Sequence, residues 1–196
     1  MSDSSATNGS RSVPSLARSI GIGALGFGVV SLVVFATVAF AERSMYRTLG
    51  VYGAYIVWIV LFVLLGGAVL GSLVRGRWRL PKFFLLFGVA FFAYGFGWMA
   101  AYFTLRSSGG EWAGSLIGSI AMALIFAAAF RTMRSAPLFS LILFVANSAG
   151  YFLGAALANS IAGPTGMLLW GAAYGLFLGA GIGAVLHYAQ KASNEY

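Results

Sequence analysis

The chain has 196 residues, of which 60% are hydrophobic and 8% are charged, and its mean hydropathy is +0.91. Soluble domains carry about 25% charged residues, so this composition excludes an ordinary soluble domain and predicts an all-α integral membrane protein. The net charge of +8 comes from basic residues in short gaps between apolar runs, which argues against nucleic acid as a partner. The absence of cysteine excludes disulfides, thiolate metal sites and cysteine nucleophiles.

The N-terminal part of the sequence is a polar stretch followed by the first apolar run. Residues 1–19 are rich in serine, and we predict that they form a disordered tail. Residues 20–41 are uncharged and long enough to cross a bilayer, which takes about 20 residues. The Ala-Phe-Ala sequence that ends at Ala41 also resembles a signal-peptidase site, and cleavage there is the alternative to a retained first span.

Five further apolar runs follow, separated by basic, proline-containing or glycine-containing segments that interrupt helices. The stretch from Ser135 to Gln190 carries no fixed charge and is too long for one helix, but Pro164 and its neighbouring glycines divide it. We therefore predict a single bundle of six transmembrane helices within residues 20–190, followed by a C-terminal tail at 191–196. The predicted spans are 20–41, 50–74, 83–105, 112–130, 137–158 and 167–188.

The basic residues predict the orientation of the six spans, because cytoplasmic loops carry an excess of Lys and Arg. With the N-terminus inside, nine basic residues lie in cytoplasmic segments and three lie in outer segments. Both ends are therefore predicted inside (N-in and C-in), and we expect the location to be a bacterial cytoplasmic membrane. The inner group is Arg11, Arg18, Arg75, Arg77, Arg79, Lys82, Arg131, Arg134 and Lys191, and the outer group is Arg43, Arg47 and Arg106.

The most regular pattern in the chain is a row of glycines, one every four residues, in the last predicted span. Each would cost a helix in water about 1 kcal/mol. In a membrane, small residues let a second helix backbone approach closely, as in GxxxG pairs. We predict a glycine-zipper packing seam, and the alternative is that such seams let helices slide, as a transporter needs. The row consists of Gly171, Gly175, Gly179 and Gly183.

The expected partner of this seam is the fifth span, because a link of about eight residues makes the two spans antiparallel neighbours. We expect Gly150 and Gly154 to face the level of Gly175 and Gly179, and this pair of helices to be the closest in the molecule. A four-residue step drifts about 40° around a helix, so either the pair crosses steeply or two partners share the row. Asn147, on the edge of the seam, is expected to donate to a carbonyl or hydroxyl of a neighbouring helix.

A weak internal match leaves a further question open. The set Trp58, Gly67, Gly71 and Arg75 recurs 112 residues later as Trp170, Gly179, Gly183 and His187. This spacing indicates either a parallel repeat of helical hairpins or chance, since Gly and Trp are common in membrane helices.

Side chains suited to catalysis are scarce, and we expect no enzyme activity, no catalytic residues, no metal site and no cofactor. The four acids lie outside the predicted spans, and the single histidine lies at the end of the last one, so no general acid–base or metal constellation can form at mid-depth. The deep polar groups are the candidates for ligand binding, and the alternative for the amide is an interhelical hydrogen bond. These candidates are Asn147, Ser148, Ser31, Tyr94 and Tyr174.

From these observations we expect a multi-pass membrane protein that binds or passes a small neutral or lipid-like molecule within its bundle. The alternative is a non-catalytic accessory or assembly subunit, whose glycine seams bind a partner membrane subunit or a second copy of the chain. The lipid bilayer itself is the remaining expected partner. The loop residues Arg75, Arg77, Arg79 and Lys82 are expected to set topology and to touch anionic headgroups.

Overall fold

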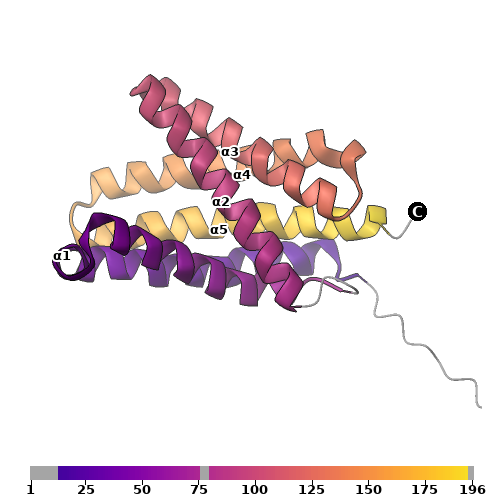
Figure 1. Ribbon diagram of the computed structural model, residues 1–196, viewed down its shortest axis with the longest axis horizontal. Helices are drawn as coiled ribbons and strands as arrows, with labels where there is room; N and C mark the ends of the chain where they lie inside the picture. Colours follow the sequence, from indigo (N-terminus) through magenta and orange to yellow (C-terminus); the bar gives the residue numbers. More distant parts are fainter. Residues whose placement is uncertain (1–12, 76–79, 194–196) are drawn as a thin grey trace, which may run out of the picture.

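The computed structural model describes residues 13–75 and 80–193, and its long elements there are all α-helices (Figure 1). Five of the described helices are long and apolar enough to cross a membrane. They are α1 (Leu16–Gly71), α2 (Leu80–Leu105), α3 (Ser108–Ala129), α4 (Ala136–Ser160) and α5 (Pro164–Ser193), with the short 3-10 helix η2 at Met133–Ser135.

The first helix begins inside the predicted N-terminal tail. The Ser15 hydroxyl accepts a hydrogen bond from the backbone N–H of Arg18 at 3.3 Å, which satisfies one of the donors that a helix start leaves open. Residues 16–19 are therefore helical, and Ser19 is buried against the last helix. The predicted tail at 1–12 and the last residues of the predicted C-terminal tail, 194–196, lie outside the described residues.

The first two predicted spans both lie in α1, which bends back on itself at Gly50 (Figure 1). This glycine has φ 69° and ψ 174°, a conformation outside the helical region that side chains with a Cβ rarely adopt. The two halves run side by side in opposite directions, because Phe27 stacks on Phe62 at 5.8 Å and Tyr46 lies 6.0 Å from Trp58. The predicted polar link at 42–49 is helical, since it lacks Pro and Gly until position 50.

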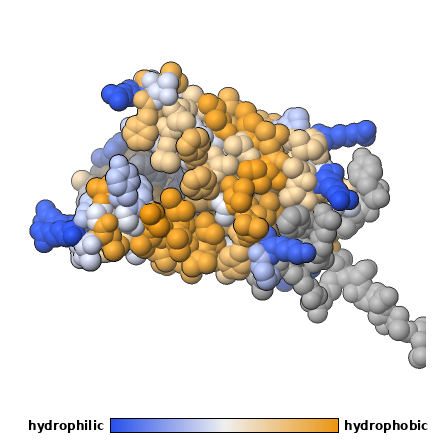
Figure 2. Space-filling view, in the orientation of Figure 1, coloured by the Kyte–Doolittle hydropathy of each residue, from blue (hydrophilic) through white to orange (hydrophobic). Residues whose placement is uncertain are grey.

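The last helix, α5, is the centre of the bundle. Its most extensive contact is with α1, and its second is with α4, while α2 and α3 form a pair that joins the rest mainly through α4. In the apolar 18-residue stretch of α5, 56% of the residues are buried, against 28% in the corresponding stretches of α1 and α4. The middle of α5 is therefore covered by other helices, whereas α1 and α4 face outward over most of these stretches. Figure 2 shows an apolar band across the middle of the molecule with hydrophilic residues at its two ends, as a bilayer requires.

The glycine row of α5 lies against the first half of α1, so the predicted pairing of this row with α4 is wrong. A Cβ added at Gly179 would collide with the carbonyl oxygen of Gly23 and would lie 2.7 Å from Cβ of Phe27. A Cβ at Gly175 would lie 2.8 Å from the carbonyl oxygen of the same Phe27. One helix follows the whole row, because α1 has its own residues at four-residue spacing there: Ser19, Gly23, Phe27, Ser31 and Phe35.

The glycines of α4 also contact α5, but they face its aromatic residues. A Cβ added at Gly150 would lie 3.1 Å from Cα of Tyr174, and one at Gly154 would lie 3.1 Å from Cα of Trp170. The predicted adjacency of these two helices is confirmed, although the contact between α1 and α5 is more extensive. The two faces of α5 thus differ: the glycine row lies toward α1, whereas Trp170, Tyr174 and Gly181 lie against the small residues of α4.

Three chain segments meet at one end of the bundle. The Gln190 amide nitrogen donates to the carbonyl of Leu73 at 3.1 Å, and its oxygen accepts the backbone N–H of Arg75 at 2.8 Å. The ring nitrogen Nδ1 of His187 lies 2.8 Å from the carbonyl oxygen of Pro14. The start of α1, the residues after α1 and the end of α5 therefore lie together, at the end that was predicted to be cytoplasmic and that we call the inner end.

Candidate functional site

A buried polar cluster joins four helices near the middle of the bundle, and we call it the hydroxyl–amide cluster. The Tyr94 hydroxyl of α2 donates to Oδ1 of Asn147 in α4 at 2.6 Å, and Nδ2 of Asn147 donates to Oγ of Ser115 in α3 at 2.7 Å. The Ser115 and Ser148 hydroxyls lie 2.7 Å apart, and either can donate. The Tyr174 hydroxyl of α5 donates to that of Tyr94 at 3.1 Å.

Glycines on α3 let the cluster form. A Cβ added at Gly118 would lie 2.8 Å from the carbonyl oxygen of Tyr94, and one at Gly114 would lie 2.9 Å from that of Trp98. The backbones of α2 and α3 therefore approach closely at this level, so the long Tyr94 side chain reaches past α3 to α4. Ser115 was not predicted as a site residue, although its place next to Gly114 put a small hydroxyl on the close-packed part of α3.

The cluster is almost fully removed from its surroundings. Asn147 and Ser115 are 0% exposed and Tyr94 is 6% exposed, so each hydrogen bond has little competition from solvent or headgroups. Interhelical bonds of this kind contribute about 0.6–2 kcal/mol each in membranes. The expectation that Asn147 donates to a hydroxyl of a neighbouring helix is confirmed.

Four of the five predicted ligand-binding residues lie in this cluster, and Ser31 lies apart from it. Ser31 is 0% exposed, and its Cβ packs on Gly175 of α5. Among the described residues its hydroxyl has no hydrogen-bond partner. Ser31 thus belongs to the seam between α1 and α5 rather than to the hydroxyl–amide cluster.

Aromatic side chains from four helices continue from the cluster toward the outer end, and we call them the aromatic row. Trp98 stacks on Tyr102 with ring centroids 5.0 Å apart and lies 5.6 Å from Tyr151. Tyr151 lies 5.7 Å from Trp170, which lies 6.1 Å from Phe35. All five side chains are partly exposed, as is Tyr174. Tyr174 connects the row to the cluster, because its ring lies 6.3 Å from that of Phe35 and its hydroxyl donates to Tyr94.

A single acidic side chain touches the row. The Tyr151 hydroxyl donates to a carboxylate oxygen of Glu111 at 3.1 Å. Glu111 lies in the first turn of α3, where the helix dipole stabilises a negative charge. In the described part of the chain, no three His, Asp or Glu side chains come close enough to hold a metal ion.

The helices α1 and α2 separate toward the outer end. They are in contact nearer the inner end, where Phe62 lies 5.2 Å from Phe91. Farther out, Tyr52 is 87% exposed and Phe96 is 63% exposed, and Figure 1 shows α2 running diagonally away from α1. Figure 2 shows a hollow on this face, between the α2–α3 turn and the folded-back end of α1.

The loop after α1 held four predicted headgroup residues, of which two can be placed. The Arg75 backbone is held by Gln190, and its guanidinium donates to the carbonyl of Ser72 at 3.0 Å. Lys82 is exposed in the first turn of α2, whereas Arg77 and Arg79 lie outside the described residues.

Comparisons of the chain with models of protein families, with curated proteins and with solved structures find no match.

Proposed function

We propose that this multi-pass membrane protein binds a small neutral or lipid-like molecule at the aromatic row. The observation that carries the proposal is that the hydroxyl–amide cluster is continuous with the aromatic row. A cluster of uncharged hydrogen-bonding groups lies in the bundle, and it reaches the partly exposed aromatic row through the hydroxyl of Tyr174.

The chemistry of these groups favours a neutral ligand. The hydroxyls and the amide of the cluster carry no charge, and the row offers flat apolar faces with polar edges at Tyr102, Tyr151 and Trp170. Pockets for small molecules have this composition, largely aromatic with a few placed polar groups. The Tyr174 hydroxyl donates to Tyr94, and its lone pairs can accept a hydrogen bond from a ligand hydroxyl.

The first prediction of this proposal concerns a neutral lipid probe. Monoolein, which has an acyl chain and two hydroxyls, is expected to change the tryptophan fluorescence of the purified protein saturably, because Trp98 and Trp170 lie in the row. Tyr174→Phe removes one hydrogen bond to the ligand and is expected to weaken this response about tenfold. Glycerol, tested in the same way and by swelling of proteoliposomes, distinguishes a small solute from a lipid.

The matched control is Tyr52→Phe, which removes a hydroxyl from a tyrosine that is 87% exposed on α1. An equal response in both variants, or none to either probe, would contradict the proposal. Co-purification of a second membrane protein at fixed stoichiometry, without any response to the probes, would favour the accessory-subunit alternative.

We further propose six membrane crossings with both ends in the cytoplasm. The support is the reversal of α1 at Gly50 and the collection of basic residues at the inner end. Because the chain has no native cysteine, single substitutions report accessibility cleanly. Ser44→Cys and Ser108→Cys are expected to react with an impermeant maleimide in intact cells, and Ser193→Cys only after permeabilisation. Labelling of Ser108→Cys from the cytoplasmic side alone would overturn this topology.

A further inference from the structure

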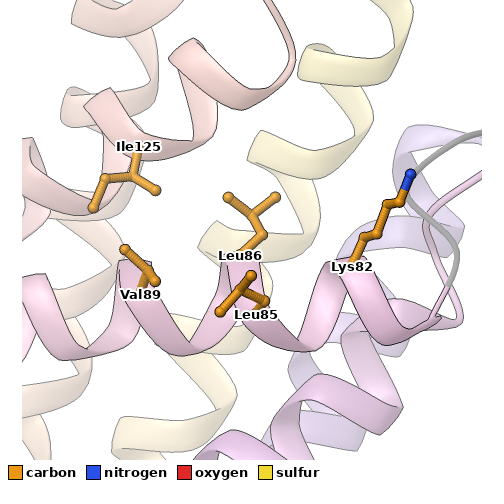
Figure 3. Close-up of a pocket in the computed structure, with 5 residues that line it drawn as sticks. All are labelled: Lys82, Leu85, Leu86, Val89 and Ile125. Atoms are coloured by element: carbon orange, nitrogen blue, oxygen red, sulfur yellow. The ribbon is translucent and has the colours of Figure 1, made fainter.

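An apolar groove lies on the side of the bundle, between α2 and α3. It is close to the inner end. Its volume is about 240 Å³, and the labelled side chains in Figure 3 form a row along it with Lys82 at one end. The lining residues are Lys82, Leu85, Leu86, Val89 and Ile125.

The groove combines an exposed apolar floor with one cation. Leu85 is 72% exposed and Val89 is 50% exposed, so these side chains face what surrounds the protein. Positions 82, 85 and 89 recur at helical spacing and lie on one face of α2. In Figure 3 the Lys82 amine points away from the four apolar side chains.

The charges around this end of the groove are all of one sign among the described residues. Exposed Arg131 and Arg134 follow the end of α3, and Lys191 lies near the end of α5. The two acids of the described chain, Glu42 and Glu111, lie toward the outer end. A negatively charged group at Lys82 would therefore meet attraction, with no carboxylate of residues 13–75 or 80–193 at this end to compete.

We propose that this groove is a binding site for an anionic phospholipid of the leaflet at the inner end. The acyl chain lies along Leu85, Val89 and Ile125, and the headgroup phosphate pairs with the amine of Lys82. The cation of the groove matches the headgroup phosphate of such a lipid, and its apolar length matches an acyl chain. A soluble anion lacks the acyl chain, and a neutral lipid lacks the negative charge. This site is separate from the hydroxyl–amide cluster and does not depend on its function.

The test measures lipid retention by native mass spectrometry of the protein released from nanodiscs. The probes are phosphatidylglycerol and phosphatidylcholine with identical acyl chains. The wild-type protein is expected to retain phosphatidylglycerol preferentially, and Lys82→Gln is expected to reduce its retention about fivefold, as loss of one near-surface cation predicts. Lys191→Gln removes a cation from the same end outside the groove and is expected to reduce retention much less than Lys82→Gln does.

A second pair of variants tests the acyl-chain part. Val89→Trp fills the groove and is expected to reduce retention of both lipids, and Leu85→Trp serves the same purpose if the first variant does not fold. Equal losses in Lys82→Gln and Lys191→Gln would mean attraction by general surface charge and would overturn the proposal. Unchanged retention in a folded Val89→Trp or Leu85→Trp protein would overturn it as well.

Discussion

Replacing Gly179 by leucine is expected to lower the free energy of unfolding by about 3 kcal/mol or more, a large fraction of the stability of a typical domain. The added side chain would meet the backbone of Gly23 and Cβ of Phe27, which lies 2.7 Å from a Cβ built at this glycine. A backbone contact cannot rotate away as the end of a flexible side chain can, so α1 and α5 must move apart. Unfolding by SDS titration in mixed micelles, followed by circular dichroism, measures the loss.

Gly21→Leu is the matched control, because a Cβ there has nothing within 4 Å although Gly21 lies two residues from Gly23 in the same helix. It is expected to be neutral or slightly stabilising, since leucine favours helix over glycine by about 0.5–1 kcal/mol. Gly23→Ala tests the other side of the contact and should destabilise the protein. Equal stability of the Gly179 and Gly21 variants would contradict the seam.

Asn147→Ala is the second large change, with an expected loss of about 2–4 kcal/mol. It removes hydrogen bonds to Tyr94 at 2.6 Å and to Ser115 at 2.7 Å, and it leaves a cavity where the side chain is 0% exposed. The Tyr94 hydroxyl is left without its acceptor and Ser115 without this donor, and both side chains are buried. The same SDS titration measures this loss.

Ser31→Ala is the control for removing a buried polar group, because the Ser31 hydroxyl has no hydrogen-bond partner among the described residues. It is expected to change stability by less than about 0.5 kcal/mol. A double-mutant cycle of Asn147→Ala with Tyr94→Phe should show a coupling of about 0.5–2 kcal/mol. No coupling would mean that the two side chains do not share a hydrogen bond in the folded protein.

Composition and helix-breaking residues were sufficient to predict most of the helices. The predicted spans 83–105 and 137–158 correspond closely to α2 (Leu80–Leu105) and α4 (Ala136–Ser160), because hydrophobic length and turn residues report directly on membrane segments. The reversal between the first two spans was predicted, but it was placed in a polar link at 42–49. Its position at Gly50 was missed, since a single glycine with positive φ inside a helix-forming sequence leaves no strong signal.

The helix that the glycine row of α5 faces could not be predicted from the short link between α4 and α5. A short link makes α4 and α5 neighbours, but it does not decide which face of α5 meets α4. The only sequence signal for the partner of the row was the four-residue spacing of Ser19, Gly23 and Phe27 in α1. This spacing is hard to recognise, because the set includes a large side chain and lies among other apolar residues.

The candidate site was partly predictable for a related reason. Asn147 and Tyr94 are conspicuous because a deep amide or hydroxyl in a membrane span needs a partner. Ser115 is less conspicuous, since serine can satisfy its hydroxyl within its own helix. The two halves of the internal match, at Trp58–Arg75 and Trp170–His187, lie in different surroundings. The ring of Phe84 packs against Gly67, whereas the backbone of Gly23 packs against Gly179.

The pairing of the first and last helices has a consequence for biosynthesis. The row on α1 that contains Gly23 is made first, and its partner on α5 is separated from it by about 150 residues of later chain. Until the last helix enters the membrane, the hydroxyls of Ser19 and Ser31 and the bare glycine backbone face lipid or the insertion machinery. Closure of the bundle therefore waits until α5 has been made, and a ribosome that stops before α5 leaves a chain whose longest seam is open.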